Sequence, residues 1–118
     1  MNFARLIVFC LASWLATGCA HTSYARVPKP SIPATEAGCK QLDGNWGPLG
    51  ISGTLRCDIK TSDSGKRCTD SRECQGSCLA PEGTEAGVSV FGACSAYVSN
   101  FGNVILVTDG KADPYNVE

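Results

Sequence analysis

Residues 65–79 read GKRCTDSRECQGSCL and decide the fold of this chain, because Cys68, Cys74 and Cys78 fall within eleven positions of one another. The whole chain has 118 residues and eight cysteines. This density is typical of small exported domains, whose limited core needs covalent reinforcement. We therefore expect structural disulfides, each contributing ~2–4 kcal/mol to the free energy of unfolding.

Short segments on both sides of this cluster have the pattern of β-strands. Residues 53–60 alternate with a period of two, which places Leu55, Cys57 and Ile59 on one face. Glycine is frequent, and the apolar residues form short runs without a sustained helical period. These features predict a β-rich domain.

Three further segments extend this prediction toward the C-terminus. Residues 88–98 are rich in β-branched and aromatic residues, and Gly92 within them predicts a bulge or a close approach of another segment. Residues 103–108 form a nearly continuous apolar run, followed by an Asp-Gly pair at 109–110 that is typical of a tight turn. We expect residues 115–117 to pair back in a hairpin.

Helix is predicted only as a turn or two, at residues 36–41 or at residues 70–75. The chain has no internal repeat and is too short after residue 39 for two domains. The predicted fold is therefore one small disulfide-rich β domain over residues 39–118, with short antiparallel strands held by disulfides.

The N-terminus has the parts of an export signal. Arg5 precedes an apolar segment, residues 6–16, that is shorter than the roughly 20 residues needed to span a bilayer. Two small residues then precede Cys19, and the whole resembles a bacterial lipoprotein signal. The resemblance implies that residues 1–18 are removed, that Cys19 carries lipid, and that Ala20 directs the protein to the outer membrane. An ordinary secretory signal, cut after Ala20, is the alternative.

The segment after the signal, residues 19–38, contains three prolines and almost no large apolar residue. Such a composition favours extended chain, so we expect a lipidated N-terminus followed by a tether. The alternative is that Tyr24 and Val27 dock on the domain.

Cysteine arithmetic agrees with the lipoprotein interpretation. Cys10 leaves with the signal and Cys19 is assigned to lipid, so six cysteines remain, which can form three disulfides in any of 15 pairings. Their spacing, C-x5-C-x3-C followed by a later cysteine, resembles the interlaced modules of many secreted disulfide-rich domains. This resemblance implies the pairs Cys39–Cys57, Cys68–Cys78 and Cys74–Cys94.

A second resemblance covers residues 39–111. A cysteine followed by a G-x-W opening at 39–46, the block GKxCTDSxxCxGxC at 65–78 and a D-G-K at 109–111 are similar to an uncharacterised group of small secreted bacterial proteins. The resemblance brings no established activity, so it informs the fold more than the function.

Metal sites are a weaker interpretation of the same residues. Only Cys74 and Cys78 have the spacing of a zinc ligand pair, and His21 is the one histidine in the chain. The acids that calcium would need do not form its D-x-[DN]-x-[DN]-G loop; they are Asp58, Asp63, Asp70 and Glu73. We expect no metal and no cofactor.

Catalysis is not expected either. His21 lies two residues from Cys19, so a Ser-His-Asp or Cys-His arrangement in the domain is excluded. The remaining acid–base candidates are aspartates in turns or at strand ends, where aspartate commonly serves the backbone; they are Asp43, Asp58, Asp109 and Asp113.

Binding is the preferred function. A cross-linked scaffold loses little entropy on docking, and aromatic residues and arginine dominate interfaces. The candidate surface comprises Trp46, Lys66, Arg67 and Arg72, with Phe91, Tyr97 and Phe101 as further aromatic residues. The alternatives are that Trp46 and Phe91 belong to the core and that the basic residues are a solvated face.

The expected partner is a protein, in addition to the membrane through the lipid on Cys19. The net charge of −1 gives no reason to expect nucleic acid or a polybasic membrane contact. Two functions remain open: an envelope lipoprotein with a binding or inhibitor-like domain, and a structural envelope lipoprotein without a discrete ligand. An exposed Trp46 would favour the first and a buried Trp46 the second.

Overall fold

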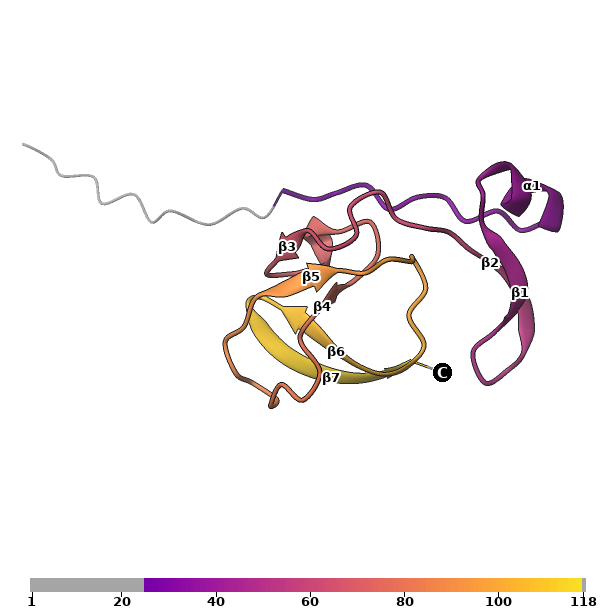
Figure 1. Ribbon diagram of the computed structural model, residues 1–118. Coiled ribbons are helices and arrows are strands. Elements are labelled where there is room, and N and C mark those ends of the chain that lie inside the picture. The colour runs from indigo at the N-terminus through magenta and orange to yellow at the C-terminus, as the bar shows by residue number, and fades with distance from the viewer. Residues whose placement is uncertain (1–24, 118) are drawn as a thin grey trace, which may run out of the picture.

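The computed structural model of the chain describes residues 25–117 (Figure 1). This part contains the helix α1 (Glu36–Gln41), the 3-10 helix η1 (Ser71–Glu73) and seven strands. The strands are β1 (Asn45–Leu49), β2 (Thr54–Asp58), β3 (Arg67–Cys68), β4 (Cys78–Leu79), β5 (Gly92–Cys94), β6 (Gly102–Thr108) and β7 (Lys111–Val117). The predicted signal, Cys19, His21 and Tyr24 lie outside the described residues.

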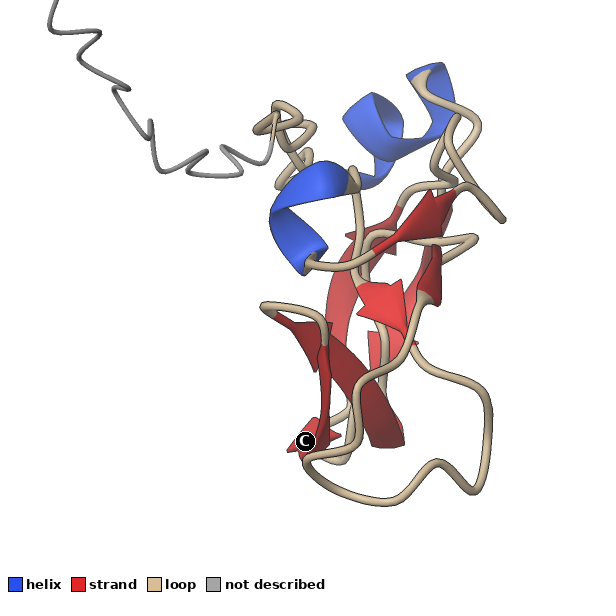
Figure 2. Cartoon of the chain, turned by 90° about the vertical axis from the view of Figure 1, so that its left-hand side faces the viewer, coloured by secondary structure: helices blue, strands red, loops and turns tan. Residues whose placement is uncertain are grey.

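The strands form two small antiparallel sheets. β1 and β2 pair as a hairpin, and the other five strands have the order β3-β5-β4-β6-β7. The two short helices lie toward one end of the strands (Figure 2). The predicted fold class, a small disulfide-rich β domain, is confirmed.

Three disulfides hold these elements together, and the implied pairing is confirmed. Cys39–Cys57 ties α1 to β2, Cys68–Cys78 ties β3 to β4, and Cys74–Cys94 ties the end of η1 to β5. The buried side chains form two clusters around them. One cluster contains Cys39, Cys57 and Ile59, and the other contains Cys68, Cys74, Cys78, Cys94 and Val107.

Both helical candidates form, and each begins at a capping side chain. α1 occupies the predicted residues, and the Thr35 hydroxyl accepts a hydrogen bond from Gly38 N at 3.2 Å. η1 lies within the second candidate segment, and the Asp70 carboxylate accepts a hydrogen bond from Arg72 N at 2.8 Å. Local capping therefore fixes where each short helix starts.

The C-terminal hairpin also follows the prediction. β6 and β7 pair over their whole length, and the turn between them uses Asp109 and Gly110 with positive φ angles of 47° and 77°. Two successive positive φ angles characterise a type I′ turn, whose twist matches that of the flanking strands. In the segment predicted as a strand over residues 53–60, Cys57 and Ile59 are buried, whereas Leu55, which was predicted to share their face, is 58% exposed.

The prediction of one long strand over residues 88–98 is wrong, because only β5 in its middle is a strand. Three successive parts of this segment pair with different neighbours. Val88 O accepts a hydrogen bond from Ala112 N near the start of β7, and Gly87 N donates to Ala112 O. β5 pairs with β3 and β4, and residues 96–98 pair with residues 59–61. A single straight strand cannot reach three differently placed partners. The predicted close approach at Gly92 is confirmed, since a Cβ there would lie 2.6 Å from the Leu79 carbonyl oxygen.

Part of the segment expected to be a tether lies against the domain. Val27 N donates a hydrogen bond to Arg72 O at 2.8 Å. The Lys29 ammonium donates to the carbonyl oxygens of Ser71 at 2.8 Å, of Cys74 at 2.7 Å and of Gly76. Between residues 25 and 117 no helix has the length and apolar character needed to cross a membrane.

Candidate functional site

Cysteines, rather than large apolar side chains, fill most of the core. Among the residues that the structure describes, the other buried apolar ones are Ile59, Val107 and Ala112. Leu55, Tyr115 and Phe91, in contrast, are 58%, 57% and 55% exposed. Because half-exposed large side chains do little for stability, their accumulation on one surface indicates a contact surface.

One such accumulation surrounds Trp46. The register of β1 and β2 pairs Trp46 with Cys57 and Pro48 with Leu55, so these four residues share one face of the hairpin. Trp46 is half-buried and packs against the cluster that contains the Cys39–Cys57 disulfide. One side of the indole therefore packs against the disulfide cluster, and the rest of the indole stays exposed.

A groove of about 400 Å³ lies over this face, and we call it the apolar groove. Three separate segments meet there: residues 32–34, the β1–β2 hairpin and residues 99–101. Its lining residues are Ile32, Pro33, Ala34, Trp46, Thr54, Leu55, Arg56, Cys57, Ser99 and Phe101. A second hollow of about 330 Å³ shares Arg56, Ser99 and Phe101 with it and continues toward β6 and β7.

The chemistry of the apolar groove suits binding rather than catalysis. Arg56 is the one charged side chain among the described residues that line it, and no carboxylate within residues 25–117 lies within 4 Å of its guanidinium. The groove therefore offers apolar and aromatic surface with one cation, which is the usual composition of a recognition site with a few polar groups.

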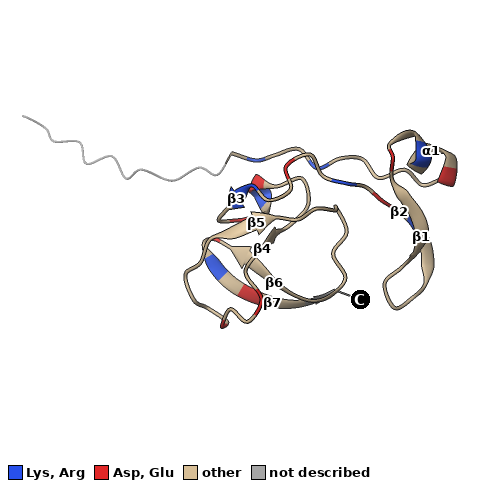
Figure 3. Cartoon of the chain, viewed as in Figure 1, with Lys and Arg blue, Asp and Glu red and all other residues tan. Residues whose placement is uncertain are grey.

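The predicted basic residues are not part of this groove. Arg67 lies on β3 and Arg72 on η1, on the opposite side of the molecule from β1 (Figures 1 and 3). The Arg67 guanidinium stacks 3.5 Å from the centroid of the exposed Phe91 ring. Lys66 is exposed next to it. The structure thus separates the predicted surface into two, with Trp46 at one end and the basic residues at the other.

Arg72 belongs to a structural ion network. Its Nε donates to Asp70 Oδ1 at 2.7 Å, and its Nη2 donates to carboxylates of both Asp70 and Asp109. Asp70 is 4% exposed and also accepts from Asp109 N at 2.9 Å. The side-chain hydrogen bond from Arg72 lowers the pKa of Asp70 from 3.8 to about 2 against an opposing effect of burial. In turn, Asp70 raises the pKa of Arg72.

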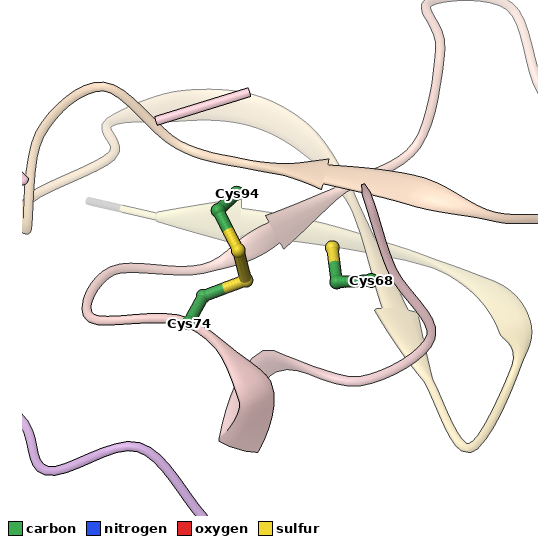
Figure 4. A group of neighbouring side chains, drawn as sticks. All are labelled: Cys68, Cys74 and Cys94. Carbon is green, nitrogen blue, oxygen red and sulfur yellow. A yellow bond between two sulfur atoms is a disulfide. The ribbon is translucent and has the colours of Figure 1, made fainter. Parts of the chain in front are cut away.

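The cysteine cluster is structural in this arrangement. The Sγ atoms of Cys68, Cys74 and Cys94 lie within 4.8 Å of one another, and Figure 4 shows the Cys68 sulfur beside the Cys74–Cys94 bond. All three sulfurs are in disulfides, the partner of Cys68 being Cys78. A sulfur in a disulfide is not a thiolate, so these atoms do not form a zinc site in the oxidised protein.

The aspartates considered for acid–base chemistry have separate places in the fold. Asp43 has a φ of 50° in the turn after α1, and Asp58 Oδ1 accepts from Ser99 N at 3.2 Å. Asp109 occupies the β6–β7 turn, and Asp113 is exposed on β7. The structure does not bring them together into a paired-carboxylate site.

Sequence reasoning missed several residues of the apolar groove. Phe101 was recognised as a possible anchor, but Ile32, Leu55 and Arg56 were not. The sequence contained a signal for Leu55, because its alternation with Cys57 and Ile59 places these residues on one face of the strand. Ile32 carried none, since its place beside Trp46 depends on how residues 25–35 dock.

No protein-family model, curated protein sequence or solved structure matches this chain.

Proposed function

We propose that the chain is an exported lipoprotein of the bacterial cell envelope, anchored in the outer membrane through lipid on Cys19. In this proposal its domain is a non-enzymatic binding module, and the apolar groove is the surface that contacts a partner protein. Neither nucleic acid nor a cofactor is part of the proposal. The lipobox-like sequence before Cys19 supports the anchor, and the three disulfides fit an oxidising compartment.

One observation carries the binding function: the domain covers its cystine core with large apolar side chains that stay partly exposed around one groove. Leu55 is 58%, Ile32 49% and Phe101 37% exposed. A purely structural lipoprotein gains nothing from leaving these residues in water, whereas a partner that covers them gains roughly 25 cal/mol for each Å² of apolar surface removed from water.

The groove is also held rigidly, which favours tight binding. Cys39–Cys57 fixes β2 to α1 directly beneath Trp46, and residues 96–98 are hydrogen-bonded to residues 59–61 just before Ser99 and Phe101. Side chains on a cross-linked scaffold lose less entropy on association than those on mobile loops.

Photo-crosslinking in the native host tests the binding function. A photoreactive amino acid at position 55 places the probe at the groove, and the same amino acid at position 64, in the exposed loop before β3, is the matched control. We expect discrete adducts from position 55 that disappear when Phe101→Ala is added, and none from position 64. Equal, diffuse labelling from both positions would favour the structural lipoprotein instead.

The anchor is tested separately by the intact mass of the protein from a membrane fraction. We expect a chain that begins at Cys19 with added acyl chains, and six alkylatable cysteines only after reduction. A chain that begins after Ala20 without acyl chains would instead indicate an ordinary secretory signal and a free exported protein.

A further inference from the structure

The described chain begins on one particular face of the domain. Val27 N is bound to Arg72 O of η1, and Lys29 is bound to the carbonyl groups around η1. Figure 1 shows that this first segment enters beside β3. If Cys19 carries lipid, only the seven residues 20–26 separate the lipid from Val27, and extended chain spans ~3.1 Å per residue. The face formed by β3, η1 and Phe91 would then lie within ~25 Å of the membrane surface.

The acidic side chains of this face are engaged within the domain. Asp70 is buried and bound to Arg72. A Glu73 carboxylate oxygen accepts hydrogen bonds from the Thr69 hydroxyl at 2.6 Å and from Thr69 N at 3.3 Å. Asp63 Oδ2 accepts from Gln75 N at 2.8 Å. These carboxylates are therefore partly withdrawn from solvent.

Basic side chains on the same face remain exposed. Arg26, Lys66 and Arg67 are all exposed, and no carboxylate of the described chain lies within 4 Å of their charged groups. The exposed charged side chains of this face that lack an ion pair within residues 25–117 are thus basic, although the whole chain carries a net charge of −1. The expectation of no polybasic membrane contact rested on the net charge of the whole chain and not on how the charges are distributed.

An aromatic ring completes this face. Phe91 is 55% exposed, and the Arg67 guanidinium stacks on it at 3.5 Å from the ring centroid. Arg67, Phe91 and Glu73 of η1 line one shallow hollow of about 310 Å³, which places the ring next to the segment that holds Val27. An apolar ring beside a basic group is the combination that proteins favour at the membrane interface.

We propose that this face, defined by Lys66, Arg67 and Phe91, binds the anionic headgroup surface of the membrane that holds the lipid anchor. The inference rests on the proposed anchoring at Cys19 and adds an orientation to it. With β3 and η1 toward the lipid, the β1–β2 hairpin and the apolar groove lie at the far end of the domain, where a partner in the aqueous phase can reach them (Figure 1).

The test uses the acylated chain in phosphatidylcholine vesicles with or without phosphatidylglycerol, each containing a lipid with a gadolinium-chelating headgroup. Paramagnetic broadening of backbone amide signals reports which residues approach the headgroups. We expect strong broadening at Lys66, Arg67 and Phe91, and little at Ile51, which is 83% exposed in the β1–β2 turn. The contrast between the two ends should require phosphatidylglycerol.

Two matched variants separate charge at this face from charge in general. Lys66→Glu should reduce the broadening at Phe91 several-fold in phosphatidylglycerol vesicles, because each basic residue strengthens binding to an anionic surface about fivefold. Lys40→Glu changes the net charge equally but lies on α1, and should leave the broadening unchanged. Phe91→Ala should reduce the broadening at Arg67. Added salt should reduce the remaining broadening by the same factor as in the native protein.

Equal broadening at Phe91 and Ile51, or a pattern that does not depend on phosphatidylglycerol, would overturn the proposed membrane face while leaving the anchor intact. A mass without acyl chains would overturn the anchor and this orientation together, before any broadening is measured. The two failures are therefore distinguishable.

Discussion

Gly92 shows how much of this fold depends on single positions. β5 lies between β3 and β4, and at Gly92 atoms of β4 and β6 come so close that no side chain fits. A Cβ at this position would lie 2.6 Å from Leu79 O and 2.8 Å from both Cys78 Sγ and Val107 Cγ2. These atoms belong to the backbone, to a disulfide and to the best-buried apolar side chain, so none can move easily.

Gly92→Ala should therefore lower the free energy of unfolding by ~1–3 kcal/mol, the usual cost of overpacking. Gly47→Ala is the matched control, because a Cβ at Gly47 meets nothing within 4 Å and φ there is not positive. Urea unfolding with the disulfides intact measures both. If the two variants lose the same stability, the close approach at Gly92 is not what constrains this position.

The lowered pKa of Asp70 makes the stability of the fold depend on pH. Its pKa is about 2 in the folded protein because of the hydrogen bond from Arg72, against an ordinary value of 3.8. A carboxylate with a lowered pKa stabilises the fold above its ordinary pKa, and the contribution is lost as the pH falls through the folded value. We therefore expect the melting temperature to fall between pH 4 and pH 2 in part through Asp70.

Asp70→Asn tests this expectation. The variant should be less stable at neutral pH by ~1–3 kcal/mol, because a hydrogen-bonded charge at a buried position is lost, and its melting temperature should depend less on pH in the acidic range. Asp113→Asn removes an exposed carboxylate that has no hydrogen-bond partner within residues 25–117, and should leave both properties unchanged. An unaltered acid profile in Asp70→Asn would contradict the argument.

At the scale of elements, the two clusters of buried residues define two units of different strength. The cluster at the β1–β2 hairpin is small, and among the described residues Cys39–Cys57 is its only disulfide. The five-stranded sheet has two disulfides and Val107 in its core. The hairpin unit should therefore open first when its disulfide is removed.

The double variant Cys39→Ala, Cys57→Ala should lose ~2–4 kcal/mol of stability in the hairpin unit, mainly because its unfolded chain is less restricted. Hydrogen exchange followed by mass spectrometry should show lost protection in α1, β1 and β2 and retained protection in β4 and β6. Uniform loss across both sheets would mean that the domain unfolds as one unit.

Sequence patterns predicted the elements that local chemistry determines. The β6–β7 hairpin follows from an Asp-Gly pair between two strands, and α1 occupies its predicted residues, where the structure adds Thr35 as the cap. The disulfide pairing came from resemblance, since spacing alone left 15 possibilities. The prediction of one long strand over residues 88–98 was wrong because tertiary pairing with different neighbours sets where strand structure forms there. The local sequence does not encode those neighbours.

At the scale of the whole molecule, the sequence predicted one binding surface, but not that its residues would lie on two separate surfaces. Trp46 and the basic residues were expected to form one surface, and the fold places them at opposite ends (Figure 1). Burial of Phe91 in the core was the alternative, because small domains usually bury their aromatic residues. In this domain cystines fill the core, and Phe91 stays exposed. Which large side chains stay exposed depends on how well the disulfides fill the core, and composition does not determine this.

The docking of Lys29 sets how the domain is held relative to its N-terminus. Three carbonyl oxygens around η1 bind its ammonium, and Val27 is fixed beside it. From Cys19, extended chain would reach at most ~25 Å to Val27 while Val27 and Lys29 are docked, and at most ~50 Å to Thr35 if the residues before it were released. In the proposed orientation, this difference decides whether β3 and η1 are kept at the membrane or only tethered near it.

Lys29→Gln should release this segment, because a neutral amide cannot replace an ammonium bound by three carbonyl groups. Trypsin cleavage after Arg26 is a direct measure, since the bond to Val27 is protected only while Val27 is docked and the bond from Lys29 to Pro30 resists trypsin in the native chain. We expect cleavage after Arg26 to be roughly tenfold faster, as losing hydrogen bonds to a charged donor costs ~1.5 kcal/mol or more. Lys40→Gln on α1 should cleave at the native rate. If Lys29→Gln also does, the N-terminal segment is free in solution, and the orientation toward the membrane loses the short connection on which it depends.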